Sequence, residues 1–281
     1  MGPRHTPHDP LTRAASTPAA LASLVEQTEA AAFLDLYRAA PPELGFEART
    51  DESHTALFAP RFDMLLFNRV IALGLQTPAS ETLVASLIDR YRSANIRNFG
   101  VQLSPEAQPG ALPHWLAGCG LRVRDAWTKV YRSNDDLPTI PTGLRVDRID
   151  ASLAERFAVV GCAAHGLPAA LTPLFASAVG RPGWHHFMAW DHGTPAAIGA
   201  LFVQNGVGWL GMGATLPAFR RRGAQGALMA LRLREGARLG CRWFVTECAQ
   251  DLPERPNPSF RNMLRTGFKV AYHRPNLLPP R

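Results

Sequence analysis

The most constraining feature of the sequence is a strand, an arginine-rich turn and a helix that follow one another over residues 208–239. Residues 208–215 alternate toward an apolar strand, and residues 225–239 carry leucines at helical spacing. Between these segments, three consecutive arginines precede Gly223. The first backbone N–H groups of a helix lack partners and carry partial positive charge, and glycine allows a ligand to approach the backbone closely. The turn is therefore predicted to bind a phosphate.

The turn resembles the Gln/Arg-x-x-Gly-x-Gly/Ala loop of the GNAT superfamily of N-acetyltransferases. Arg220 and Gly223 stand at its first and fourth positions, and Gln225 stands at the sixth, where glycine or alanine is usual. In that family the loop amides hold the pyrophosphate of acetyl-coenzyme A (acetyl-CoA), and the backbone of the preceding strand contacts the acetyl and pantetheine groups. The resemblance implies acetyl-CoA as co-substrate. The binding residues that it implies are Met212, Gly213, Ala214, Thr215, Leu216, Arg220, Arg221, Arg222, Gly223, Ala224, Gln225 and Gly226. The alternative is an ordinary turn with solvated arginines.

The segments around this turn resemble the rest of a GNAT fold. Residues 257–268 are similar to the family's stretch in which a helix that starts with asparagine ends in Gly-Phe. This part of the resemblance adds Asn257, Ser259 and Arg261 to the implied acetyl-CoA-binding residues. Other helices are expected at 152–164 and 169–179, and strands at 143–147, 183–190, 195–204, 241–248 and 269–274. The resemblance implies an α+β fold with a mixed sheet and an acetyl-CoA-binding GNAT domain over residues 142–281.

The first half of the chain, residues 19–132, looks like a weak repeat of the second half, residues 142–281. The segment 112–120 and the strand after it mirror residues 261–268 and their following strand. Residues 75–81 stand where the phosphate loop would be, but they contain neither arginine nor glycine. Other helices are expected at 20–38 and 81–94, and strands at 64–73, 99–103 and 122–131. We therefore predict two tandem GNAT-like domains, of which the first is degenerate, with a linker at 133–141 and a disordered lead at 1–18.

Acetyl transfer to an amine requires a base for the amine and an acid for the leaving thiolate. Glu247 is the candidate base, because it lies near the end of an apolar strand where the two central strands should splay around the acyl group. Its alternative role is an ion pair with an arginine such as Arg222 or Arg261. Many GNAT enzymes have a tyrosine acid at the position of Met263, so Ser259 is the candidate acid here.

Charge and cysteine content bear on other classes of function. The net charge of +7 is compatible with RNA binding, but much of the excess lies around the phosphate turn and no aromatic residues interleave the arginines. Arg232, Arg234 and Arg238 are expected on a solvated helix face. Cys119, Cys162, Cys241 and Cys248 lack the spacing of a zinc site, so no metal is predicted; Cys248 is weighed as a nucleophile and as a core residue.

The sequence thus predicts an N-acyltransferase that moves an acetyl group from acetyl-CoA to an amine by direct attack in a ternary complex. The alternative is a non-catalytic acyl-CoA-binding or interaction protein, suggested by Gln225, Met263 and the first half without a phosphate loop. The predicted partner is a small-molecule or peptide amine, with a homodimer as an option, and neither nucleic acid nor a membrane is expected. No apolar run reaches the roughly 20 residues of a membrane helix, and a signal-peptide core is lacking, which favours a cytoplasmic location.

Overall fold

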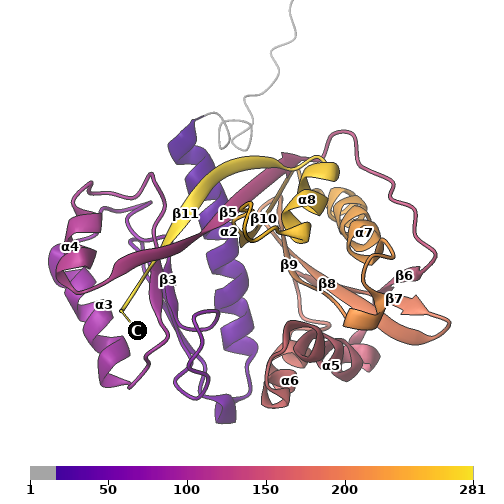
Figure 1. Cartoon of the computed structure of the whole chain (residues 1–281), viewed down its shortest axis with the longest axis horizontal. Coiled ribbons are helices and arrows are strands. Elements are labelled where there is room, and N and C mark those ends of the chain that lie inside the picture. Colours follow the sequence, from indigo (N-terminus) through magenta and orange to yellow (C-terminus); the bar gives the residue numbers. More distant parts are fainter. Residues whose placement is uncertain (1–16, 281) are drawn as a thin grey trace, which may run out of the picture.

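The computed structural model describes residues 17–280, which form seven α-helices and one large mixed sheet (Figure 1). The helices are α2 (Pro18–Ala39), α3 (Glu81–Ser93), α4 (Leu112–Gly118), α5 (Ala154–His165), α6 (Thr172–Ser177), α7 (Ala224–Arg238) and α8 (Pro258–Arg265). The strands of the first half are β1 (Glu47–Thr50), β2 (Thr55–Phe58), β3 (Arg69–Ile71), β4 (Gly100–Gln102) and β5 (Arg122–Ser133). Those of the second half are β6 (Arg145–Ile149), β7 (Trp184–Asp191), β8 (Thr194–Gln204), β9 (Val207–Thr215), β10 (Trp243–Ala249) and β11 (Lys269–Leu278).

The sheet runs without interruption through both halves, in the order β1-β2-β3-β4-β11-β5-β10-β9-β8-β7-β6. The last strand of each half lies against the other half. β5 pairs with β10 along seven residues, from Trp243–Ser133 to Ala249–Trp127, while β11 pairs with β4 as well as with β5. Figure 1 shows β5 and β11 crossing between the halves. Residues 134–144, which include most of the predicted linker, contain neither helix nor strand.

Helices cover both faces of the sheet, and each layer has its own core. α7 and α8 pack on one face of the second-half strands, whereas α5 and α6 pack on the other (Figure 1). α2 lies on the same face as α5 and α6, where it contacts α6, β9 and β10, so its core spans both halves. A separate core joins α3 and α4 to the first-half strands.

Most of the predicted elements are found, and the differences have local causes. Of the predicted strand at 64–73 only β3 forms, because the Asn68 side chain binds the backbone of Ala59, Phe62 and Met64 and so holds a turn. The short strands β1 and β2 were not anticipated; β1 is mostly exposed and has no buried face to produce an alternating pattern. Residues 1–16 of the predicted lead lie outside the described residues, while Thr17 caps α2 by accepting a hydrogen bond from the Ala20 N–H.

Within residues 17–280, no helix combines the length and the apolar character needed to cross a membrane.

Candidate functional site

The start of α7 presents a row of unpaired backbone donors. Gly223 is the N-cap of α7 with φ 80°, and Arg221 also has a positive φ of 63°. The N–H groups of residues 221–226 donate no hydrogen bond to any other group within residues 17–280. A Cβ on residue 223 would lie 3.1 Å from the carbonyl oxygen of Pro141, so only glycine fits this conformation without strain. The turn therefore has the donor set of an anion site.

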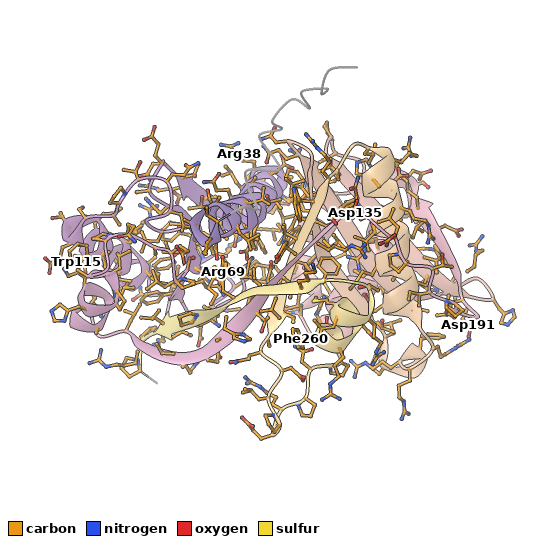
Figure 2. The ribbon with its side chains drawn as sticks, turned by 90° about the horizontal axis from the view of Figure 1, so that it is seen from above. Arg38, Arg69, Trp115, Asp135, Asp191 and Phe260 are labelled. Carbon is orange, nitrogen blue, oxygen red and sulfur yellow. The ribbon has the colours of Figure 1, made fainter. Side chains whose placement is uncertain are left out.

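The three arginines of the turn have different partners. Arg222 forms a two-pronged ion pair with Asp191 at the end of β7, at 2.7 and 2.8 Å, and this arginine holds the pKa of the Asp191 carboxyl below its usual value. Figure 2 shows Asp191 at one end of the molecule. Arg220 and Arg221 are exposed and pair with no carboxylate of residues 17–280. Two of the three positive charges are therefore free for a ligand.

β9 contains a bulge just before this turn. Ile198 pairs with Ala214, and Ala200 pairs with Gly211, which leaves two residues of β9, Met212 and Gly213, opposite Gly199 alone. Met212 has a φ of 53°, in the left-handed region.

The same stretch of β9 parts from β10. The two strands pair in parallel only over Val207–Trp209 and Trp243–Val245, although they extend to Thr215 and Ala249. The splay expected from the sequence is therefore present, with backbone groups of residues 212–216 along one side of it.

Gln225, the departure from the family pattern, has a role in packing. Its Nε2 donates to the carbonyl oxygens of Ala214 (2.8 Å) and Ile198 (3.2 Å) and to Oγ1 of Thr215 (3.1 Å). The side chain thus lies against β8 and β9 and ties the start of α7 to the sheet.

Glu247 lies on the face of β10 that meets α2. Its Oε2 accepts hydrogen bonds from Lys129 Nζ (2.9 Å) and Trp209 Nε1 (3.2 Å). The side chain is 8% exposed, and Oε1 has no partner within residues 17–280 and is not fully enclosed. The alternative prediction, an ion pair between Glu247 and Arg222 or Arg261, is wrong. Glu247 pairs with a lysine, whereas Arg222 pairs with Asp191 and Arg261 with Asp251 (3.5 Å).

Lys129 connects Glu247 to a buried ionic network that belongs mainly to the first half. Its Nζ also donates to Glu29 Oε2 on α2 (2.8 Å), and Glu29 is further paired with Arg274 and Arg69. Burial raises the pKa of Glu29, but Arg274, Lys129 and Arg69 lower it more, so this carboxyl titrates well below its usual range. All four side chains are fully buried, and Figure 2 shows Arg69 near the middle of the molecule.

The residues predicted at α8 are only partly available. The Asn257 side chain caps α8, because its Oδ1 accepts from the N–H groups of Ser259 (3.0 Å) and Phe260 (3.4 Å). Ser259 is exposed, and its hydroxyl has no partner within residues 17–280. Met263 is buried in the core under α7 and α8. Ser259 and Glu247 lie on opposite faces of the sheet, so the structure does not bring the two candidate catalytic side chains together.

Two further predictions concern Cys248 and Arg232. Burial, with the charges of Glu247 and Asp251, raises the pKa of Cys248 to about 12, which makes this thiol a poor nucleophile. Arg232 is only 2% exposed, so its expected place on a solvated helix face is wrong. It lies one turn after Leu228 on the buried face of α7, and this i+4 spacing is the signal that could have revealed it. No comparable sequence pattern pointed to Lys129 or Glu29.

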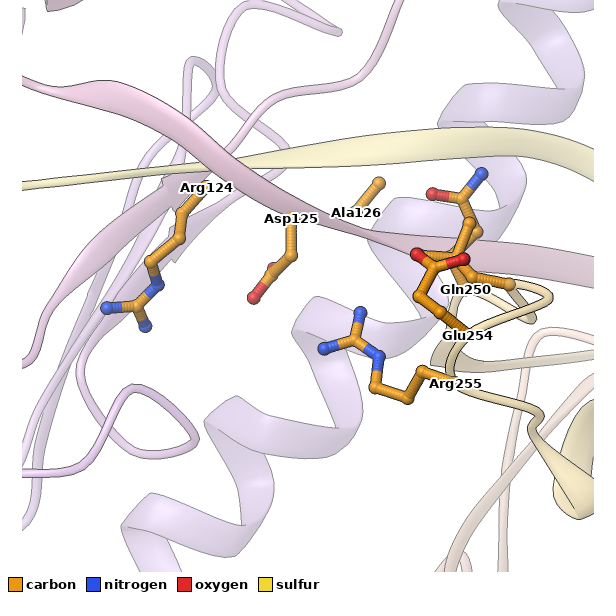
Figure 3. Close-up of a pocket in the computed structure, with 7 residues that line it drawn as sticks. Arg124, Asp125, Ala126, Gln250, Glu254 and Arg255 are labelled. Atoms are coloured by element: carbon orange, nitrogen blue, oxygen red, sulfur yellow. The ribbon is translucent and has the colours of Figure 1, made fainter.

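A pocket of about 630 Å³ opens at the junction of the two halves (Figure 3). It is lined by Arg124, Asp125, Ala126, Gln250, Leu252, Glu254 and Arg255. Figure 3 shows the Arg124, Asp125 and Arg255 side chains below β5, with α2 behind Arg255. Asp125 precedes Lys129 by four residues on the same face of β5, a distance of about 13 Å along the strand. The pocket thus lies on the α2 side of the sheet, as Glu247 does.

Comparison with known proteins shows which fold this architecture is similar to. No protein-family model and no curated protein sequence matches the chain. Its structure is similar to a GCN5-related N-acetyltransferase from Kribbella flavida, with a TM-score of 0.64 and 18% identity over 95% of this chain and 97% of that one. It is also similar to a tandem GNAT protein from the clavulanic acid biosynthesis pathway (TM-score 0.57, 18% identity, 80% of this chain and 77% of that one). A GCN5-related N-acetyltransferase from Sphaerobacter thermophilus gives 0.55, with 15% identity over 82% and 80% of the two chains. The chain therefore has the tandem GNAT fold that its sequence resembles.

Proposed function

We propose that the protein is an N-acyltransferase that moves an acetyl group from acetyl-CoA to an amine. The observation that carries this proposal is the row of unpaired N–H groups at residues 221–226, at the end of a strand that has parted from its neighbour. A pyrophosphate suits these donors and the free charges of Arg220 and Arg221. The backbone of residues 212–216 would line the pantetheine and acetyl groups in the splay.

Bound acetyl-CoA would supply a thioester whose carbonyl carbon can be attacked by an amine. Glu247 is the base in this proposal: its Oε1 is free to accept a proton from an incoming ammonium group. Lys129 and Trp209 hold the carboxylate through Oε2 and so aim Oε1. The nitrogen would then form the amide bond as the carbon–sulfur bond breaks, and the leaving thiolate would take its proton from water, because Ser259, the acid predicted from the sequence, lies on the other face of the sheet from Glu247.

The acceptor would approach from the face of α2, through the pocket at the junction of the halves. In that pocket Asp125 and Glu254 would pair with the amine, beside Arg124 and Arg255, which would suit an acceptor that also carries a carboxylate. The first half would thus contribute to the acceptor side through β5 and α2, while the second half binds the acyl donor. A small-molecule or peptide amine remains the proposed partner.

The experiment that tests the proposal measures acetyl-CoA binding by calorimetry and thiol release with a panel of amines. The Arg221→Gln variant should bind acetyl-CoA about tenfold more weakly, because a free charge is lost from the turn. Arg238→Gln, at the far end of α7, makes the same charge change where Arg238 already pairs with Glu235, and it should bind as the wild type does. Binding without turnover would support the non-catalytic acyl-CoA-binding alternative. Absence of binding would contradict both.

A further inference from the structure

α7 contacts the β9 bulge on both of its sides. Gln225 and Arg232 are seven positions apart in α7, so they lie two turns apart on the same face of the helix, about 10 Å from one another. Gln225 binds the carbonyl oxygens of Ile198 and Ala214, which are the last paired residues on one side of the bulge.

Arg232 does the same on the other side. Its Nη1 donates to the carbonyl oxygens of Ala200 and Gly211, both at 3.2 Å, and these two residues are the next pair in the β8–β9 register. Its Nε donates to Leu228 O (3.2 Å) within the helix. The two side chains of α7 therefore bracket Met212 and Gly213.

The surroundings of Arg232 suit a side chain that binds backbone carbonyl groups and not one that forms an ion pair. The side chain has no carboxylate partner within residues 17–280, and burial lowers its pKa to about 10, so it is still charged at neutral pH. A buried cation is costly unless it is hydrogen-bonded, and here backbone carbonyl groups accept from its Nε and Nη1. A Cβ on residue 199 would lie 2.8 Å from the Arg232 Cζ, so Gly199 leaves the space that the guanidinium fills.

We infer that Gln225 and Arg232 are positioning residues that fix the β9 bulge relative to the phosphate-binding turn. Both contacts come from the helix whose first residues form that turn, so the turn and the bulge move as one unit. For a ligand that binds the turn at one end and residues 212–216 at the other, the distance between its two binding places is then fixed before it binds. This inference rests on the proposed function, because acetyl-CoA is the ligand that would reach both places.

The test compares two ligands on the Arg232→Met variant. Acetyl-CoA would contact both the turn and β9, whereas 3′-phosphoadenosine 5′-diphosphate carries the pyrophosphate without the pantetheine arm. We expect the variant to bind acetyl-CoA about 10-fold or more weakly, since the bulge is no longer held at a fixed spacing from the turn and must be ordered by the ligand. Binding of the nucleotide should change by about twofold at most. Arg234→Met, on the exposed side of α7, is the control and should bind both ligands as the wild type does. Equal weakening of both ligands by Arg232→Met would overturn the inference.

A second measurement separates the failure of this inference from the failure of the proposed function. If the wild type does not bind acetyl-CoA, the proposed function fails. Amide hydrogen exchange then tests separately whether Gln225 and Arg232 hold the bulge in place. Arg232→Met, or Gln225→Ala where the first variant does not fold, should speed exchange at residues 211–214 more than at β10. Uniform acceleration across the sheet, or none at all, would contradict the positioning role.

Discussion

At the scale of single residues, Glu247 is the side chain whose chemistry depends most on its neighbours. One oxygen is held by Lys129 and Trp209, and the other has no partner within residues 17–280. A carboxylate fixed in this way can take a proton without losing its place. The partner of Glu247 is a lysine from the other half of the chain and not one of the arginines near it in the sequence. This is because β5, which carries Lys129, lies beside β10 only in the folded sheet.

We predict that Glu247→Gln lowers kcat for acetyl transfer by about 100-fold or more, because the amide cannot accept the proton of the amine. Acetyl-CoA affinity should stay within about twofold of the wild type, since the residue lies on the opposite face from the phosphate turn. Steady-state kinetics and calorimetry measure the two effects. Glu155→Gln on the exposed side of α5 removes a carboxylate elsewhere and serves as the control. An unchanged kcat would exclude Glu247 as the base.

A separate prediction concerns the contribution of Glu29 to the free energy of unfolding. Its carboxyl has a pKa well below its unfolded value of 4.5, so its ion pairs stabilise the fold above about pH 4.5, and this contribution is lost as pH falls toward the folded pKa. Glu29→Gln removes the one carboxylate that pairs with Arg69 within residues 17–280, and one of the two that pair with Lys129 and with Arg274, so it should lower the free energy of unfolding by about 3–5 kcal/mol at pH 7.

The difference between the wild type and Glu29→Gln should shrink between pH 5 and pH 3 in urea unfolding. Glu43→Gln, at an exposed carboxyl, provides the baseline for the pH series. A stability difference that stays constant from pH 7 to pH 3 would show that the charge of Glu29 is not the source of the effect.

At the scale of elements, the strand, turn and helix around Gly223 work as one unit. The turn depends on two left-handed residues, on the segment at Pro141 that packs against it and on Gln225, which joins it to β8 and β9. A glycine at the other end of α7 provides a matched comparison. Gly240 has φ 87°, but no atom lies within 4 Å of where its Cβ would be.

Gly223→Ala and Gly240→Ala should each destabilise the fold by about 1–2 kcal/mol, because alanine is strained at positive φ. Only Gly223→Ala should also weaken acetyl-CoA binding, since its methyl group would crowd Pro141 and displace the turn. Thermal unfolding and calorimetry on both variants separate the two effects. Equal affinities for acetyl-CoA in the two variants would mean that the turn does not hold the ligand.

The sequence was informative where elements depend on local signals. The turn, α7 and the capped start of α8 follow from glycine, arginine and asparagine at short spacing, and the structure confirms these elements. Arg232 was misplaced because a charged residue in a helix is normally solvated, and its acceptors on β8 and β9 are distant in the sequence. The ion pairs of Lys129 and Glu29 depend likewise on long-range packing, which no local pattern records.

At the scale of the whole molecule, the exchange of the last strands makes the two halves depend on each other. β10 has β5 of the first half as its neighbour, and β4 has β11 of the second half. Arg274 on β11 also carries a charge into the ionic network around Glu29. A division of the chain at the predicted linker would therefore leave each half with an unpaired strand edge.

We predict that residues 142–281 expressed alone do not form a soluble, cooperatively folding monomer, because β10 loses its partner and β11 loses β4 and β5. Co-expression with residues 1–141 should restore a one-to-one complex that elutes with the intact protein in size-exclusion chromatography. A full chain with a protease site inserted at residues 134–136 is the control; after cleavage it should keep its elution volume and its unfolding midpoint, since those residues belong to no helix or strand. A monomeric 142–281 fragment with its own sharp unfolding transition would contradict the mutual dependence. In that case the acyl-donor site would belong to an independent domain, and the first half would matter only for the acceptor.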